Sequence, residues 1–99
     1  MQKYIARIGH LNFSSAAELE NFSKQYSQEA ISLSREALEL KLITTSDNSA
    51  LLLGIYKNLE DAEIVLRRLK PWLAQFSEVY EQSFYLMGDL EFSYQKEEA

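Results

Sequence analysis

The chain has 99 residues, a formal net charge of −5 at pH 7 and no cysteine. The length predicts a single domain, residues 1–99, with a modest core. The acidic balance argues against nucleic-acid binding, because neutralising phosphates needs clustered Lys and Arg. The missing thiols exclude disulfides, cysteine nucleophiles and sulfur-bound zinc. No apolar run approaches the roughly 20 residues that span a bilayer, and residues 1–3 lead directly into a strand pattern without a signal peptide, so we expect a cytoplasmic protein with no membrane partner.

The first predicted element is a strand over residues 4–13. One face carries Tyr4, Ala6, Ile8, His10 and Asn12, and the other carries Ile5, Arg7, Gly9, Leu11 and Phe13. Because neither face is purely polar, we expect this strand in the middle of a sheet that is covered on both sides.

A helix is predicted next, because Ser15 and Glu18 have the spacing of a capping box. Its apolar residues recur at steps of three and four, which places them on one stripe: Leu19, Phe22, Tyr26 and Ala30, with Leu33 as a last candidate. No glycine marks the end of this helix, and we expect it to end near Ala30.

Residues 38–56 predict a β-hairpin with the turn Ser46-Asp47-Asn48-Ser49. Its first strand alternates Leu38, Leu40 and Leu42 with charged residues, which indicates one strongly apolar face. The second strand places Leu51, Leu53 and Ile55 on one side, and Leu52 and Tyr56 on the other, with Gly54 between them. A strand that is apolar on both faces needs cover on both, and two helices can cover only one. The uncovered face predicts a partner subunit.

The second helix is predicted to begin at Asn58, which can cap it with Asp61 three positions on. Its expected apolar stripe is Leu59, Ala62, Val65 or Leu66, and Leu69. Pro71 disfavours helical geometry in the residue before it, so we expect a break at Lys70 and a short further turn over residues 71–76.

Residues 77–87 predict a strand, with Tyr80, Phe84 and Leu86 on one face and Val79, Tyr85 and Met87 on the other. We expect a bend at Gly88-Asp89, a final short strand through Leu90, Phe92 and Tyr94, and a frayed tail. The order strand, helix, strand, strand, helix, strand predicts an α+β, ferredoxin-like βαββαβ fold with an antiparallel four-stranded sheet.

Three local patterns accompany this order: Tyr4-Ile5-Ala6-Arg7-Ile8 at the start, Ile55-Tyr56-Lys57-Asn58-Leu59-Glu60-Asp61-Ala62 at a strand-to-helix junction, and Lys70-Pro71-Trp72-Leu73. With these patterns the chain resembles the antibiotic-biosynthesis-monooxygenase-like family of the dimeric α+β barrel superfamily. The resemblance implies that two chains pair into a barrel and that a pocket lies between sheet and helices. Members include cofactor-independent quinol oxygenases, haem-degrading enzymes and isomerases, so the fold leaves the reaction open.

Two departures from that family bear on function. Trp72 stands where many members have a His after the Pro, and Arg7 or Ile8 stands where haem-degrading relatives place an Asn. Neither a haem site nor an oxygenase site is therefore carried over intact.

His10 is the only histidine and a candidate catalytic acid or base, because an unperturbed imidazole titrates near neutral pH. The alternative is a hydrogen-bonded histidine near the end of a strand. Trp72 is a candidate for stacking a planar ligand, although a Trp after a stripe of Leu is more often part of the core. Tyr4, Tyr56 and Tyr85 are candidate ligand-binding residues, with Tyr80 a further strand tyrosine, and packing in a dimer interface is the alternative.

The acidic group Glu60, Asp61 and Glu63 points in several directions from one helical turn, so we expect no metal site. Glycine-rich phosphate loops, paired-His motifs and nucleotide fingerprints are absent from the sequence, and we expect no bound cofactor. The basic cluster Arg67, Arg68 and Lys70 is interpreted as a solvated helix face rather than an anion site.

Two functional hypotheses follow. The first is a homodimer that oxidises a small aromatic or quinone-like molecule as a cofactor-independent monooxygenase, with His10 or a tyrosine moving the proton. The second is a non-catalytic module on the same fold that binds a small ligand or serves in assembly.

Overall fold

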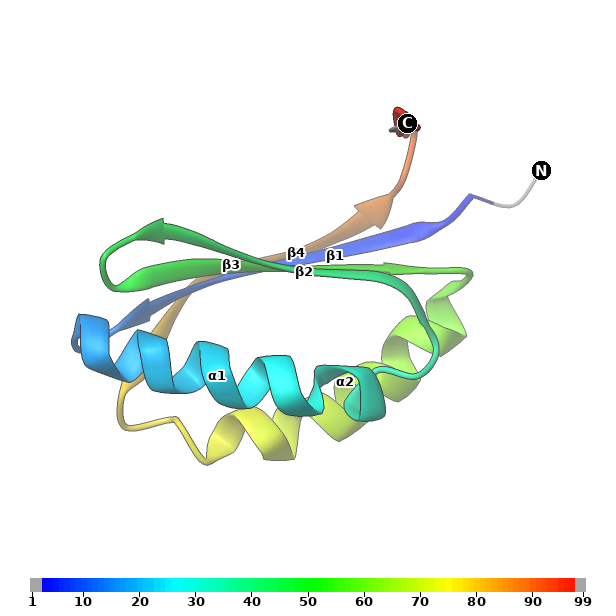
Figure 1. Cartoon of the computed structure of the whole chain (residues 1–99). Helices are drawn as coiled ribbons and strands as arrows, with labels where there is room; N and C mark the ends of the chain where they lie inside the picture. The colour runs from blue at the N-terminus through cyan, green and yellow to red at the C-terminus, as the bar shows by residue number, and fades with distance from the viewer. Residues whose placement is uncertain (1–2, 98–99) are drawn as a thin grey trace.

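The computed structural model describes residues 3–97, which form six elements around one antiparallel sheet (Figure 1). In chain order they are β1 (Ile5–Phe13), α1 (Ala16–Leu33), β2 (Ala37–Ser46), β3 (Ser49–Tyr56), α2 (Leu59–Ala74) and β4 (Tyr80–Asp89). The strands lie in the order β2-β3-β1-β4, and each neighbouring pair is antiparallel. Both helices pack on the same face of the sheet. The ferredoxin-like fold predicted from the sequence is confirmed.

The first helix forms as its cap and stripe predict. The Ser15 hydroxyl accepts a hydrogen bond from the Glu18 backbone N–H at 3.2 Å, and Leu19, Phe22, Tyr26 and Ala30 are buried. The expected end near Ala30 was three residues too early, since α1 continues to Leu33 and is closed by the N–H of Ser34 donating to the Ala30 carbonyl.

The hairpin of β2 and β3 also forms as predicted, with one difference in its first strand. Leu40 and Leu42 pack against the core, but Leu38 is 55% exposed. The pairing with β3 shifts between Ala37 and Glu39, so one residue is inserted there and Leu38 leaves the apolar face. A period-2 pattern does not reveal such a bulge.

The second helix begins at its predicted cap, where the Asn58 side chain accepts from the Asp61 N–H at 2.8 Å. The predicted break at Lys70 was wrong, because α2 runs through Pro71 to Ala74. Pro71 and Arg67 both lie on the exposed side of the helix. A carbonyl that loses its partner N–H to a proline can be hydrated there, so the helix continues. Leu59, expected in the apolar stripe, is half exposed at the start of the helix.

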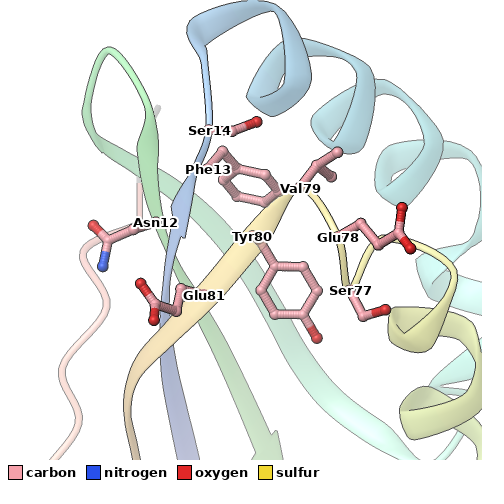
Figure 2. A pocket seen from close by; sticks show the side chains of 8 residues that line it. All are labelled: Asn12, Phe13, Ser14, Ser77, Glu78, Val79, Tyr80 and Glu81. Carbon is pink, nitrogen blue, oxygen red and sulfur yellow. The ribbon is translucent and has the colours of Figure 1, made fainter.

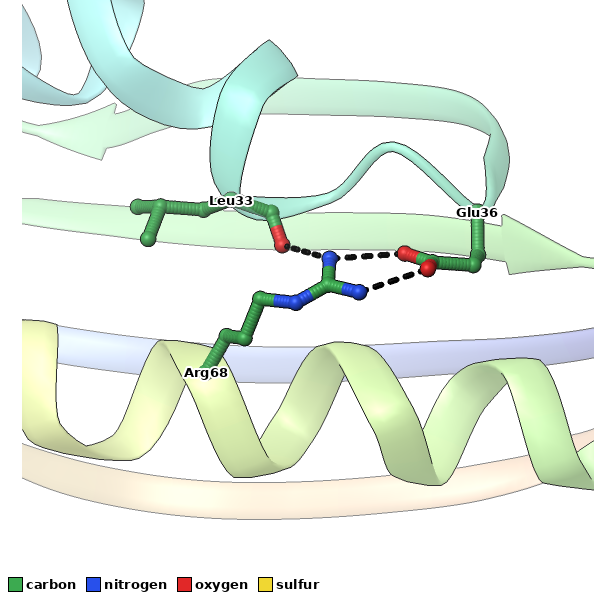
Figure 3. Close-up of polar contacts among 3 residues, drawn as sticks. All are labelled: Leu33, Glu36 and Arg68. Carbon is green, nitrogen blue, oxygen red and sulfur yellow. Dashed lines mark hydrogen bonds and ion pairs between the residues drawn. The ribbon is translucent and has the colours of Figure 1, made fainter.

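An ion pair ties α2 to the end of α1 (Figure 3). The Arg68 guanidinium donates to both carboxylate oxygens of Glu36, at 2.7 and 2.6 Å, and to the Leu33 carbonyl at 2.9 Å. This carbonyl belongs to the last turn of α1, where backbone oxygens have no helical partner. The Arg68 side chain therefore closes one helix and connects it to the other.

The last strand departs from the expectation at both of its ends. It begins at Tyr80, because residues 75–79 form turns that follow α2. The expected final strand through Leu90, Phe92 and Tyr94 is not formed in this chain, where no described residue beyond Asp89 is in a strand. The Leu90 N–H donates to the Tyr4 carbonyl at 2.8 Å, and the segment then leaves the sheet edge.

The two faces of the sheet follow from the strand register. The covered face packs on the helices and carries Arg7, Gly9, Leu11, Ala50, Leu52, Gly54 and Tyr56. The open face, on the other side, carries Ala6, Ile8, His10, Ile43, Leu51, Leu53, Ile55, Phe84 and Leu86, together with the polar Asn12 and the ion-paired Glu39 and Lys41. Over residues 3–97, neither helix is long and apolar enough to cross a membrane.

Candidate functional site

A cleft of about 520 Å³ lies between the covered face of the sheet and the second half of α2. Its lining residues are Arg7 of β1, Leu66, Lys70, Leu73 and Ala74 of α2, Ser77 of the following turn, and Tyr80, Gln82 and Tyr85 of β4. The α2 wall is largely apolar, whereas the sheet wall presents phenol, amide and guanidinium groups. One apolar wall and a few convergent polar groups are typical of a small-molecule site.

A bulge in β4 brings three of these residues to one face. His10 pairs with Phe84 but Leu11 pairs with Gln82, so Ser83 is an extra residue in the strand. The Asn12 side chain donates to the Ser83 hydroxyl beside this bulge. Tyr80 and Gln82 before the bulge therefore share the covered face with Tyr85 after it. The expectation that Tyr80 shares a face with Phe84 and opposes Tyr85 was wrong for this reason.

Arg7 is the buried polar group of the cleft, with 7% of its surface exposed. Its Nε and Nη2 donate to the Tyr56 hydroxyl at 3.3 and 2.7 Å, and its Cζ lies 5.6 Å from the centre of the Tyr56 ring. Tyr56 is fully buried. The phenol and its ring therefore hold the guanidinium in one orientation at the cleft.

Gly54 makes this arrangement possible. It is the cross-strand partner of Arg7, and the Tyr56 side chain lies over it. A Cβ at Gly54 would collide with the Tyr56 hydroxyl and lie 2.9 Å from two of its ring carbons. The glycine in the middle of this otherwise bulky strand thus leaves space for the tyrosine that positions Arg7.

Both cleft tyrosines stay protonated over a wider pH range than a free phenol. Burial raises the pKa of Tyr80, and burial also raises the pKa of Tyr85, with the positive charge of Arg7 acting in the opposite direction. They are therefore neutral hydrogen-bond donors at neutral pH, suited to contacting oxygen atoms of a ligand.

His10, the predicted catalytic residue, lies on the open face and is not brought together with the cleft. Its Nε2 shares a hydrogen bond of 3.0 Å with the Thr45 hydroxyl, and its ring stacks on Phe84 at 5.4 Å. Within residues 3–97, its Nδ1 has no hydrogen-bond partner. The register places it on the opposite side of the sheet from Arg7 and the cleft.

The four predicted ligand-binding residues lie in different places. Tyr85 lines the cleft, and Tyr56 lies behind it as the partner of Arg7. Trp72 packs on Phe22, Tyr26 and Phe76 at 5.0 to 5.9 Å and donates its indole N–H to Glu29, which fits the core alternative. Tyr4 is about half exposed and precedes β1, away from the cleft.

A second hollow, at the start of β4, is less suited to a ligand (Figure 2). Its polar lining residues Asn12, Ser14, Ser77, Glu78 and Glu81 are all exposed, and none of them is a buried polar group comparable with Arg7 of the cleft. Figure 2 shows Asn12 and Glu81 on one side of the strands and the Tyr80 ring on the other, with its hydroxyl directed toward Ser77. The polar groups of this hollow therefore diverge, and only Tyr80 and Ser77 are shared with the cleft.

Acidic groups and metal ligands do not converge in the described part of the chain. No three His, Cys, Asp or Glu side chains of residues 3–97 are arranged to hold a metal ion. The cleft lining contains neither a carboxylate nor an imidazole.

Sequence reasoning missed Arg7, Lys70, Ser77 and Gln82 as cleft residues. For Arg7 a signal was present, because it is the one charged residue on a strand face otherwise formed by Ile5, Gly9, Leu11 and Phe13. Lys70 was interpreted as a solvated residue, and it is exposed at the cleft. Gln82 could not be assigned to a face without knowledge of the bulge.

The sequence matches no protein-family model and no curated protein. Solved structures are similar over nearly the whole chain. A dimeric ferredoxin-like protein from an uncultured marine organism has a TM-score of 0.77 and 12% identity, covering 93% of this chain and 99% of its own. HapK from Hahella chejuensis has a TM-score of 0.76 and 10% identity, with 94% and 99% covered.

SnoaB, a cofactor-independent oxygenase from Streptomyces nogalater, has a TM-score of 0.68 and 12% identity, with 96% of both chains covered. At these identities the likeness concerns the fold. The resemblance to monooxygenase-like ferredoxin folds that the sequence predicts is confirmed at that level.

Proposed function

We propose that this protein binds a small aromatic or quinone-like molecule in the cleft between α2 and the sheet and oxidises it with dioxygen, without a metal or bound cofactor. The observation behind this proposal is that one cleft is lined by apolar residues of α2 and by Tyr80, Gln82 and Tyr85 of β4. The fold shared with a cofactor-independent oxygenase supports it. A planar ring would lie against the leucines while its oxygen substituents meet the phenols and the amide.

In this proposal the reactivity toward dioxygen comes from the substrate itself. Loss of a proton from an activated CH₂ beside an aromatic ring to the solvent at the mouth of the cleft gives a carbanion that reacts with O₂. One oxygen atom then forms the new carbonyl, and the other leaves as water with the two hydrogens of the CH₂. The protein would orient the ring, and the neutral phenols of Tyr80 and Tyr85 would donate hydrogen bonds to the substrate's oxygens.

Oxygen consumption with a panel of quinols and anthrones tests this function. We expect uptake above the buffer rate, reduced by Tyr85→Phe in the cleft and unchanged by Tyr94→Phe, which alters an exposed tyrosine outside it. His10→Ala tests the catalytic residue predicted from the sequence, since a loss of uptake in that variant would place proton transfer on the open face. Uptake that the protein does not accelerate with any compound would exclude the oxygenase.

The second candidate is a non-catalytic ligand-binding module. It is favoured by the cleft lining, which offers no carboxylate or imidazole as a base. Binding of the panel compounds with no accelerated oxygen uptake, in wild type and in Tyr85→Phe, would establish this function instead.

We also propose that the protein is a homodimer whose two open faces pack together about a two-fold axis. Phe84 and Leu86 are 42% and 59% exposed on this face, and Ile43 adds to the same apolar surface. A self-complementary apolar face is what an isologous dimer buries. A similarly folded protein is dimeric, which supports the association of two chains.

Light scattering at micromolar concentration tests the dimer. Leu86→Asp should give a monomer, whereas Ile31→Asp, which changes an even more exposed apolar residue on α1, should leave the dimer intact. Cutting the chain after Gly88 removes the segment that contains Phe92 and Tyr94, and we expect weaker association if that segment clasps the partner. A monomeric wild type would exclude the paired sheets, and an unaltered dimer after truncation would exclude only the clasp.

A further inference from the structure

The charged residues that line the cleft are of one sign, although the whole chain carries a net charge of −5. Arg7 and Lys70 are its two ionised lining residues, and both are cations. The ion pairs among residues 3–97 involve Lys3, Lys41 and Arg68, so within that range neither cleft cation is neutralised by a carboxylate. A cleft with this charge attracts anions.

The burial of Arg7 makes this imbalance informative. Enclosing a guanidinium without a counter-charge is unfavourable, and proteins usually pair such a group with a carboxylate. Here the contacts of Arg7 are the hydroxyl and ring of Tyr56, and neither of these is a carboxylate. An anion in the cleft would supply the missing counter-charge.

The hydrogen bonds of the Arg7 guanidinium leave its Nη1 available to a ligand. Its hydrogen bonds to Tyr56 use Nε and Nη2, and Nη1 makes none to the described residues. Nη1 is not sealed from solvent, and Arg7 lines the cleft, so this nitrogen can meet a ligand there. An oxyanion is the natural partner for such an oriented, charged donor.

We propose that the ligand of the cleft is an anion: a planar aromatic molecule whose ionised oxygen acid, a carboxylate or a phenolate, is bound by Arg7, with Lys70 adding positive charge at the mouth. This inference rests on the proposed binding of an aromatic molecule in the same cleft and specifies its charge. Tyr56 is a positioning residue, since it fixes the guanidinium through Nε and Nη2. Tyr80 and Tyr85 donate to the uncharged oxygens of the ligand.

The test compares 2-naphthoate with neutral 2-naphthamide, which have nearly the same shape, by isothermal titration calorimetry on the full-length protein. A charge-assisted hydrogen bond corresponds to about 10- to 100-fold in affinity. We expect 2-naphthoate to bind more tightly than the amide by a factor in this range, and the difference to shrink with added salt. The affinity for 2-naphthol is measured below and above the pH at which its hydroxyl ionises. Tighter binding of the ionised form indicates a site that accepts phenolates, and equal binding of the two forms indicates a site specific for carboxylates.

Variants assign the effect to the cleft. Arg7→Met should abolish the preference for 2-naphthoate while the amide still binds, with circular dichroism confirming the fold. Lys70→Gln should weaken 2-naphthoate binding about threefold, and Arg67→Gln, an exposed neighbour outside the cleft, should have no effect. If Arg7→Met does not fold, the Lys70→Gln and Arg67→Gln pair decides.

Each outcome separates this inference from the function on which it rests. Equal binding of acid and amide would overturn the anion site and leave the aromatic cleft in place. A preference for 2-naphthoate that survives Arg7→Met, or that responds equally to Lys70→Gln and Arg67→Gln, would also overturn it. Failure of both compounds to bind would contradict the proposed function as well.

Discussion

The covered face and the open face of the sheet alternate along the same strands, and on β1 each face carries one ionisable side chain. Arg7 is buried beside a cleft, held by Tyr56 over Gly54. His10 lies on the open face, hydrogen-bonded to Thr45 and stacked on Phe84. Residue type alone therefore does not locate a binding site in this fold. A concave wall opposite the polar group is also needed, and only α2 supplies one.

Neighbouring leucines of β3 should separate the two faces most strongly. Leu52 is buried in the helix-covered core, so Leu52→Ala should lower the free energy of unfolding by about 2–5 kcal/mol at every protein concentration. Leu53 is half-buried on the open face, and Leu53→Ala should reach a comparable loss only where the dimer forms. Urea denaturation at several concentrations measures both, and identical concentration-independent losses would contradict the distinction.

The two glycines of the covered face provide a matched pair of smaller changes. Gly54→Ala forces the Tyr56 ring to move and should lower the free energy of unfolding by about 1–3 kcal/mol. Because Tyr56 positions Arg7, the guanidinium should also lose its fixed orientation. Gly9→Ala meets only the Gln82 Nε2 at 3.7 Å, an ordinary contact, and should be nearly neutral. Thermal unfolding of the two variants measures this difference. Equal stabilities would show that Tyr56 repacks freely.

The cap of α2 should affect only the covered face. Asn58→Ala removes the side chain that accepts from the Asp61 N–H, and we expect a loss of about 1 kcal/mol in unfolding free energy. Because the open face is untouched, the dimer dissociation constant should not change. An altered dissociation constant at constant secondary structure would link the helix layer to the interface, contrary to the separation of the two faces.

The smallest expected effect is the pH dependence of the ion pair in Figure 3. Hydrogen bonding from Arg68 lowers the pKa of Glu36 from 4.5 to about 2. A lowered pKa in the folded state stabilises the protein above pH 4.5, and this contribution disappears as the pH falls toward 2. The stability difference between wild type and Glu36→Gln should therefore shrink over that range in acid denaturation. It should also decrease with salt, because the pair is near the surface.

Much of the fold could be predicted from the sequence because its signals are local. The caps at Ser15 and Asn58 and the stripe through Phe22 and Tyr26 depend on neighbours within one or two helical turns. The hairpin turn at residues 47–48 is equally local. The helix break predicted from Pro71 was wrong because packing of Trp72 and Phe76 against Phe22 of α1 outweighs the helix-breaking tendency of proline.

The candidate site was less predictable because it depends on relations between distant segments. Arg7, Lys70 and Tyr85 meet only after β1 pairs with β4 and α2 packs across both. The sequence indicated Arg7 on an apolar strand face but not the concave space in front of it. His10 was predicted as the catalytic residue because of its residue type, and its catalytic role stays a prediction.

The extra residue Ser83 has an evolutionary consequence. Because side chains alternate along a strand, deleting this one residue would rotate either Tyr80 and Gln82 or Tyr85 to the opposite face without changing any of them. A single codon gained or lost in β4 could thus remove or create one wall of the cleft while the fold persists. Lineages that share this architecture could diverge in ligand through a length change in β4, with no substitution at the binding residues themselves.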